Sequence, residues 1–244
     1  MSRDAPRLYC APNDAPFVEG GSVTLLPGQA HYLGSVMRQS IGAVIRLFNA
    51  VDGEWEAELS ALRKDKGAVV LRQQVRVPQE TKGAILLFAP LKRDATELVI
   101  RMGTELGVTR FLPVITERTN MPRLNLERLS LIVTEAAEQC ERLDVPEIEA
   151  PKPLLQRLVE WPVTDALYAA LERQPGAAVA DDVTGTVGLL IGPEGGFSPA
   201  EMQRLQAHNA VRALSLGALV LRADTAVCAG LSRLAVKAHK TYIE

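Results

Sequence analysis

Hydrophobic and polar positions change their pattern about a third of the way along the chain. Before that point, residues 54–59 alternate polar and apolar side chains with period two, as a half-buried strand does. Residues 44–48 and 68–71 are predicted strands on either side, and turn sequences with Gly and Asp separate the three segments. Short strands between tight turns predict a small β-barrel over residues 1–76.

A polar segment with Pro and Gly at residues 77–83 then predicts a linker. Beyond it, continuous apolar runs typical of buried parallel strands alternate with segments of helical spacing. The predicted strands are 84–89, 110–115, 166–170 and 187–191. The predicted helices are 94–106, 126–140, one that begins after Ser198, and one from about 225 to 240. Strands that alternate with helices predict an α/β domain with a mainly parallel sheet over residues 77–244.

Several residues mark where these helices begin and end. Gly107 is placed as the C′ residue of the first helix, and Asn125 as the N-cap of the second. Ser198 as N-cap, followed by Pro at the next position and Glu201 three residues on, is a capping-box pattern. Asp224 is predicted to cap the last helix.

Composition and charge exclude several classes of protein. The formal net charge is −2, and neither predicted domain is basic enough to indicate nucleic-acid binding by itself. The three cysteines form no CxxC pair, so we expect neither a disulfide framework nor a metal site. No secretory signal and no membrane-spanning apolar run is visible, and we expect a cytoplasmic protein without a membrane partner.

The most informative segment is LLIGPEGGFSPAE at residues 189–201, where a buried strand ends in a Gly/Pro loop that leads into a capped helix. Ligands of open α/β sheets bind outside the carboxyl ends of strands, and glycine lets the backbone approach them closely. The loop has neither the P-loop ending nor the GxGxxG spacing, so a nucleotide-type ligand would bind without the usual phosphate cradle. The local pattern alone fits a tight turn without a ligand equally well.

A second strand, glycine loop and helix start occupies residues 215–226. Arg222 lies just before the helix, where the macrodipole disfavours a cation, so its position suggests an anionic partner outside the helix. The alternative is a surface Arg paired with Asp224 or Glu194.

Two weaker segments have plain structural interpretations. The polar residues 116–119 follow a strand, which is the usual place of a solvated turn. In the segment 135–142, Ala136, Ala137 and Cys140 form a smooth face at helical spacing. Close helix packing is the favoured interpretation there, and a subunit interface would be one form of it.

Five sequence blocks follow one another in a fixed order over most of the chain. They are HYLGSVMR at 31–38, TELGV at 104–108, TER at 116–118, EAAEQCERLDVP at 135–146, and LLIGPEGGFSPAE at 189–201 followed by LGALVLRADTA at 216–226. Together they resemble the RsmE-type 16S ribosomal RNA uracil-N3 methyltransferases of the SPOUT superfamily. Members often have Glu-Thr where this chain has Asp224-Thr225, a change that keeps the charge.

The resemblance implies a small PUA-like barrel followed by a SPOUT α/β domain with a trefoil knot, and a homodimer whose site is completed across the interface. It also implies S-adenosylmethionine as the cofactor, held by the two glycine loops. The residues expected to bind it are Ile191, Gly192, Pro193, Glu194, Gly195, Gly196, Leu216, Gly217, Leu221, Thr225 and Ala226.

The implied reaction needs particular side chains. The proton on uracil N3 must leave, and charge that develops on the flanking carbonyls needs stabilising donors. Arg118 and Arg222 are the candidates for orienting RNA or balancing that charge, and Glu194, Glu117 or Asp224 could accept the proton. The residues expected to bind 16S ribosomal RNA, within a small-subunit particle, are Arg3, Arg7, His31 and Arg38.

Two rival functions remain open at this point. One is a catalytically silent RNA-binding or assembly protein on the same scaffold, against which the intact glycine loops argue. The other is a SPOUT transferase that acts on ribose 2′-O or on transfer RNA. The segment 31–38 in the predicted barrel favours the uracil-N3 group over it.

Overall fold

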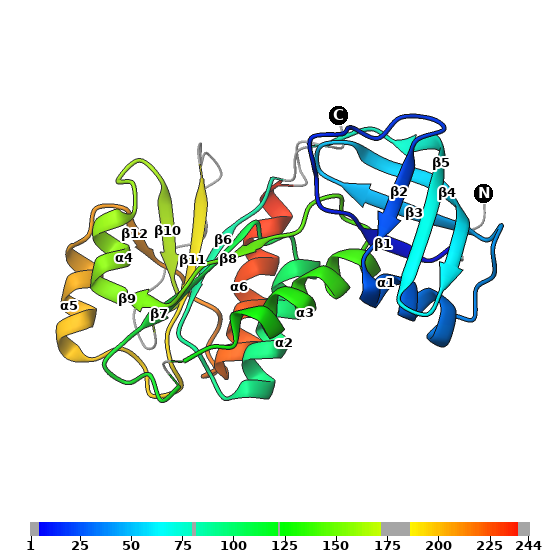
Figure 1. Ribbon diagram of the computed structural model, residues 1–244. Coiled ribbons are helices and arrows are strands. Elements are labelled where there is room, and N and C mark those ends of the chain that lie inside the picture. Colours follow the sequence, from blue (N-terminus) through cyan, green and yellow to red (C-terminus); the bar gives the residue numbers. More distant parts are fainter. Residues whose placement is uncertain (1–4, 80–81, 122, 172–185, 239–244) are drawn as a thin grey trace. The chain divides into compact units, whose positions relative to one another are not determined.

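The computed structural model describes residues 5–79, 82–121, 123–171 and 186–238. The chain forms two compact units, and Figure 1 labels the helices and strands of each. One consists of Met1–Glu80 with Ala137–Val145, and the other of Thr81–Ala136 with Pro146–Glu244. This division differs from the one predicted at residue 76 because a segment from the middle of the chain packs with the N-terminal unit.

The first unit is built on a five-stranded sheet in the order β1-β3-β4-β5-β2. β1 pairs with β3 in parallel, and the other neighbours are antiparallel. Its strands are β1 (Arg7–Tyr9), β2 (Ser22–Leu25), β3 (Val44–Asn49), β4 (Gly53–Arg63) and β5 (Lys66–Arg76). A short α-helix, α1 (Pro27–His31), runs on into a π-helical turn, η1 (Tyr32–Val36). The predicted small β domain is confirmed, and β1, β2, α1 and η1 are added to it.

The period-two pattern on β4 has the predicted effect. Ala57 and Leu59 are fully buried in the core of the unit, while Glu58 between them is partly exposed. The turn before this strand needs glycine at one position. Gly53 has a φ of +76°, and a Cβ atom there would lie 2.2 Å from the carbonyl oxygen of Arg76. The turn predicted at this point is therefore fixed by both backbone conformation and space.

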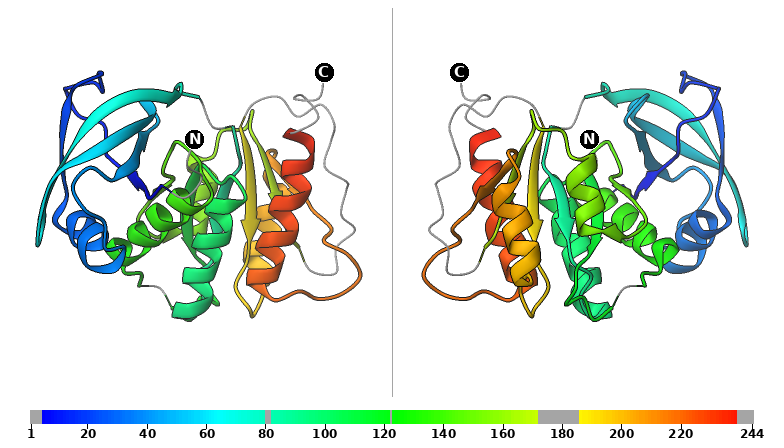
Figure 2. Two further views of the ribbon diagram at one scale, coloured as in Figure 1. Left: turned by 90° about the vertical axis from the view of Figure 1, so that its right-hand side faces the viewer. Right: turned by 90° about the vertical axis from the view of Figure 1, so that its left-hand side faces the viewer.

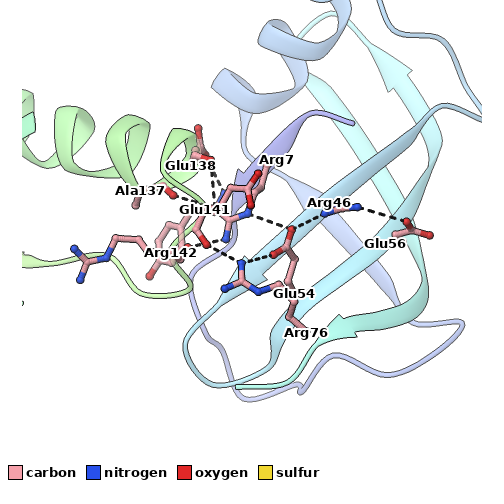
Figure 3. A network of polar contacts seen from close by, with 10 residues as sticks. Arg7, Arg46, Glu54, Glu56, Arg76, Ala137, Glu138, Glu141 and Arg142 are labelled. Atoms are coloured by element: carbon pink, nitrogen blue, oxygen red, sulfur yellow. Dashed lines mark hydrogen bonds and ion pairs between the residues drawn. The ribbon is translucent and has the colours of Figure 1, made fainter. Parts of the chain in front are cut away.

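A buried ion-pair network joins residues 137–145 to this sheet (Figure 3). At its centre is Glu54, whose side chain is 1% exposed and which pairs with Arg7 at 3.2 Å, Arg76 at 3.1 Å and Arg46 at 3.5 Å. The Arg7 guanidinium also donates to the carbonyl oxygens of residues 137, 138 and 142, at 2.9, 3.3 and 2.6 Å. These carbonyls lie at and beyond the end of a helix, where the macrodipole favours a cation.

The second unit contains a parallel sheet in the order β12-β10-β11-β6-β7-β8, with β9 also pairing with β7. Its strands are β6 (Ile85–Phe88), β7 (Arg110–Ile115), β8 (Glu147–Ile148), β9 (Lys152–Pro153), β10 (Ala166–Ala169), β11 (Val187–Ile191) and β12 (Val211–Ala213). The predicted mainly parallel α/β domain is confirmed. The very short strands β8, β9 and β12 were not predicted.

Helices cover both faces of this sheet (Figures 1 and 2). They are α2 (Arg93–Glu105), α3 (Leu126–Gln139), α4 (Leu154–Glu160), α5 (Pro199–Ala207) and α6 (Ala223–Ala238). Strand residues such as Leu87 and Leu190 share a buried cluster with Leu158 of α4 and Leu205 of α5. On the opposite face α6 packs so closely that a Cβ atom added at Gly230 would lie 2.7 Å from Leu189. Both faces are buried, which explains the continuous apolar runs.

The predicted helix ends are confirmed at three of four positions. Gly107 has a φ of +84° just after α2, and the Asn125 side chain accepts from the Arg128 amide at 3.0 Å. Ser198 and Glu201 form the predicted capping box of α5. Asp224 as the cap of the last helix is wrong, because α6 begins at Ala223 and its first turn closes on the Arg222 carbonyl, 2.7 Å from the Ala226 amide. Residues 239–240, predicted for this helix, lie outside the described residues.

Candidate active site

The carboxyl ends of the central strands lie level with one another. Ile191 of β11 is opposite Phe88 of β6, which in turn is opposite Pro113 of β7. The loops that follow β7, β11 and β12 therefore leave the sheet at the same edge. Ligands of open α/β sheets bind at that edge, and all predicted cofactor and catalytic residues lie on or next to these loops.

The glycine loop, residues 192–197, follows β11 directly. It turns back on itself through a hydrogen bond from the Gly196 amide to the Pro193 carbonyl, 2.8 Å long, and Gly196 has a φ of +69°. At Gly192 a Cβ atom would lie 2.9 Å from the Phe197 ring, so this glycine is needed for packing. At Gly195, which is exposed, a Cβ atom would meet only the Arg118 side chain, at an ordinary 3.6 Å. The backbone of Gly195 is thus open to a ligand.

The loop after β7 contacts the glycine loop. Arg118 donates from Nη1 to the Gly195 carbonyl oxygen at 2.8 Å. The amide of Glu117 donates to Oε1 of Glu201 at 2.9 Å. The sequence predicted Glu201 only as part of a capping box, and this second contact joins residues 84 positions apart. No local pattern shows such a pairing.

The second glycine loop, residues 214–222, lies between β12 and α6. Gly217 has a φ of +122°, which disfavours every other residue at that position. Leu216 and Leu221 are half-buried, whereas the side chains of Leu219 and Val220 are 80% and 66% exposed. Two neighbouring apolar side chains that face solvent favour a ligand or partner that covers them. Just beyond, Thr225 is exposed and Ala226 is buried in the first turn of α6.

The predicted catalytic residues are accessible but not clustered by direct contacts. Arg118, Glu117, Glu194 and Arg222 are all exposed. Glu194 belongs to the glycine loop, and Arg118 is hydrogen-bonded to it. In the part of the chain that the structure describes, no carboxylate pairs with Arg222, so its alternative pairing with Asp224 or Glu194 is absent. Asp224 instead accepts from the Thr225 amide at 2.7 Å.

The residues predicted to bind RNA have different environments. His31 and Arg38 are exposed at either end of the π-helical turn, and Arg38 has a φ of +52°, rare for a residue with a side chain. Arg7 differs: its side chain is 8% exposed, lies 3.5 Å from the centre of the Phe48 ring and is engaged in the Glu54 network. That is the environment of a structural residue, not of a phosphate contact. Arg3 lies outside the described residues.

The small-residue face of α3 is used for packing within the chain. Ala136 is 5% exposed and Ala137 is fully buried. Both side chains are covered by the chain itself, as a packing role for this face predicts. A subunit interface draws no support from them.

A cavity of about 350 Å³ lies at the opposite, amino-terminal edge of the parallel sheet. Five of its charged lining residues pair with one another, Arg110 and Arg157 with Glu149 and Lys152 with Glu160, and Asp165 accepts from the Thr164 hydroxyl. The paired charges and the distance along the strands from the glycine loops separate this cavity from the candidate site. Among the described residues no group of His, Cys, Asp and Glu is arranged to hold a metal ion, and no helix is long and apolar enough to cross a membrane.

Comparison with known proteins matches both units. Residues 78–235 fit the model of an RNA methyltransferase domain, and residues 27–72 fit that of an RNA methyltransferase PUA domain. The chain is 32% identical to ribosomal RNA small subunit methyltransferase E of Rickettsia conorii over 84% of its own length and 85% of the relative's. It is 35% identical to the protein of that name from Synechocystis, over 94% of its own length and 77% of the relative's.

A solved structure is similar over the whole chain. The ribosomal RNA small subunit methyltransferase E of Neisseria gonorrhoeae, crystallised with S-adenosylmethionine, superposes with a TM-score of 0.83 at 26% identity. The similarity covers 98% of both chains.

Proposed function

The chain belongs to the ribosomal RNA small subunit methyltransferase E family of RNA methyltransferases, and on that premise we propose that it methylates N3 of a uracil in 16S ribosomal RNA with S-adenosylmethionine as the methyl donor. The observation that carries the proposal is the glycine loop at the carboxyl edge of the sheet, with an open backbone at Gly195 and Arg118 bound to its carbonyl. The intact loop argues against a silent binding protein on the same scaffold.

The residues at this edge fit the proposed cofactor. The adenine base of the cofactor has apolar faces and a polar edge. The site offers exposed apolar side chains at Leu219 and Val220 for the faces, and open backbone at Gly195 for the edge. The proposed binding set is the one that the resemblance implies, Ile191 to Gly196 with Leu216, Gly217, Leu221, Thr225 and Ala226. The bound cofactor supplies an electrophilic methyl group on a sulfonium, so the protein's task is to position the acceptor nitrogen in line with it.

The chain's own residues supply the remaining chemistry. N3 lies on the Watson–Crick edge of uracil, so the base must be unpaired when it reacts. One of the carboxylates Glu117 and Glu194, which are exposed, or Asp224, which is half-buried, takes the N3 proton. Arg222, free of a carboxylate partner in the described part of the chain, stabilises charge on a uracil carbonyl, while Arg118 holds the glycine loop.

The N-terminal unit is the proposed RNA-positioning module, with His31 and Arg38 as its contacts. Both side chains are exposed, as a contact with the phosphates of the RNA backbone requires. The trefoil knot, the homodimer, a small-subunit particle as substrate and a cytoplasmic location follow from the family resemblance and complete the proposal.

Replacing Gly195 with alanine or valine is expected to weaken S-adenosylmethionine binding, the larger side chain more. The Cβ atom of alanine would meet no protein group closer than Arg118 at 3.6 Å, so the folded chain accommodates it and a loss of affinity in that variant reports on the ligand. Isothermal calorimetry measures the affinity. Gly217 is a poorer test, because its φ of +122° makes any substitution strained whether or not a ligand binds there.

The reaction itself is tested with ribosomal RNA from a strain that lacks the gene. Small subunits from that strain are incubated with the purified protein and the cofactor, and the RNA is mapped by mass spectrometry. We expect a single added methyl group on a uracil base. A methyl group on a ribose 2′-oxygen, or one on transfer RNA only, would instead establish the rival transferase function. An unmodified RNA would favour the silent binding protein.

A further inference from the structure

Glu201 makes more contacts than a capping residue needs. Its side chain is buried in the first turn of α5, at 5% exposure. Oε2 accepts from the Ser198 amide at 2.9 Å, which is the ordinary capping-box bond. Oε1 accepts from the Glu117 amide, also at 2.9 Å, and Glu117 belongs to the loop after β7. One carboxylate therefore joins the start of α5 to a loop that follows another strand.

The loop after β7 is itself held in one conformation. The hydroxyl of Thr119 accepts from the Thr116 amide at 2.9 Å, and the Thr119 amide donates to the Thr116 carbonyl at 3.2 Å. Arg118 lies within this closed turn, and its Nη1 donates to the Gly195 carbonyl oxygen at 2.8 Å. The turn thus contacts the glycine loop through Arg118 and the first turn of α5, which follows that loop, through the Glu117 amide.

These contacts fix both ends of the glycine loop. At its beginning the loop continues β11, where the Ile191 carbonyl accepts from the Ala89 amide at 3.0 Å. At its end Ser198 is held by Glu201, which is in turn held by Glu117. Between these anchors, an added Cβ atom would find open space at Gly196 and only Arg118 at Gly195, and the loop is held by the bond from Arg118 and by its own Gly196-to-Pro193 hydrogen bond.

We infer that Glu201 is a positioning residue for the cofactor site: its carboxylate couples the turn at 116–119 to the glycine loop and so sets the loop's binding conformation. The inference rests on the proposed function, because it takes the glycine loop to bind S-adenosylmethionine. Hydrogen bonds to an ionised acceptor are about twice as strong as neutral ones, and the buried Ser198 amide would be left unsatisfied without its acceptor. Removal of one carboxylate oxygen should therefore loosen the turn and the loop together.

Glu201→Gln is the direct test, because the amide has nearly the same shape but only one accepting oxygen. It can satisfy Ser198 or Glu117, but not both. We expect the affinity for S-adenosylmethionine, measured by calorimetry, to fall about tenfold, as loss of one charge-assisted bond implies. In the protein without cofactor, we expect the Glu117 amide to exchange its hydrogen faster.

Ser198→Ala is the matched control. It removes the 3.2 Å bond from the Glu201 amide to the Ser198 hydroxyl, and with it part of the helix cap, but it leaves both carboxylate bonds in place. We expect it to lower the melting temperature without changing cofactor affinity or exchange at Glu117. Equal losses of affinity in the two variants would reduce Glu201 to a helix cap, and so would an unchanged affinity in Glu201→Gln.

Thr119→Val offers a second test that leaves α5 untouched. It removes the hydroxyl that closes the turn at 116–119, and it should lower cofactor affinity in the same direction. An unchanged affinity would contradict the coupling. If the unmodified protein does not bind S-adenosylmethionine at all, the proposed function fails. Exchange at Glu117 still decides whether Glu201 holds the turn.

Discussion

Replacing Glu54 with alanine is expected to lower the free energy of unfolding by about 3–5 kcal/mol, the usual cost of removing one partner of a buried ion pair. Three arginines, at positions 7, 46 and 76, surround this 1% exposed carboxylate. Arg46 would keep its contact with Glu56 at 4.0 Å, whereas Arg7 and Arg76 would lose the carboxylate that pairs with them. The Arg7 guanidinium is itself almost buried, so water cannot replace the lost partner there. Urea denaturation followed by circular dichroism measures the change.

Glu58→Ala is the matched control. It lies on the same strand, β4, and pairs with an arginine of β5, Arg72, at 2.7 Å. The side chains of Arg72 and Glu58 are 55% and 41% exposed, so this ion pair contributes less than about 1 kcal/mol to stability. If the two variants lose similar stability, the Glu54 network has no special energetic role.

The same network shows why the sequence misassigned Arg7. An arginine near the start of a predicted RNA-binding domain has no local feature that distinguishes a surface position from a buried one. Its partners are Glu54, 47 residues away, and the carbonyl of Arg142, 135 residues away. Residue spacing carries information about neighbours on one helix or strand. Pairings between distant segments require the fold.

Local patterns predicted the elements whose periodicity was long enough. The strands 110–115 and 187–191 are present with the predicted bounds, because residues 111–115 and 187–191 are apolar and mostly buried. β4 and β5 each extend to 11 residues, well beyond their predicted lengths, because their outer parts are exposed and carry little hydrophobic signal. β1 and β12, with three residues each, are too short to show any period.

In the candidate site, too, features formed by adjacent residues could be predicted from the sequence, and contacts between distant segments could not. The glycine loop and the cap of α5 could be read from LLIGPEGGFSPAE, because strand end, glycines and Ser198 are adjacent in the chain. The role of Arg118 could not, since its contact is with the carbonyl of Gly195, 77 residues away. Asp224 was chosen as a cap by residue type, yet the helix begins at Ala223, two residues before the predicted start. Residue type predicts where a cap is possible, and the path of the preceding loop selects the position.

Arg222→Ala is expected to lower the single-turnover methylation rate by about 10²–10³-fold at saturating RNA and cofactor, the usual effect of removing one donor that stabilises developing charge. Arg222 is exposed beside the start of α6, where the helix dipole disfavours a cation, and no carboxylate in the described part of the chain balances it. An unpaired cation in that position favours an anionic partner from outside. The measurement is a quench-flow assay with RNA in which the target uracil is unmodified.

The folded chain should tolerate this change, which makes the rate a clean readout. The helix start depends on the Arg222 carbonyl, 2.7 Å from the Ala226 amide, and alanine keeps that carbonyl. An exposed side chain without an ion pair contributes within about 0.5 kcal/mol to stability. Arg204→Ala, an exposed arginine in the last turn of α5, is the control and should leave the rate unchanged. If Arg222→Ala instead lowers the melting temperature and keeps its saturated rate, the arginine has a structural role and its catalytic assignment must be abandoned.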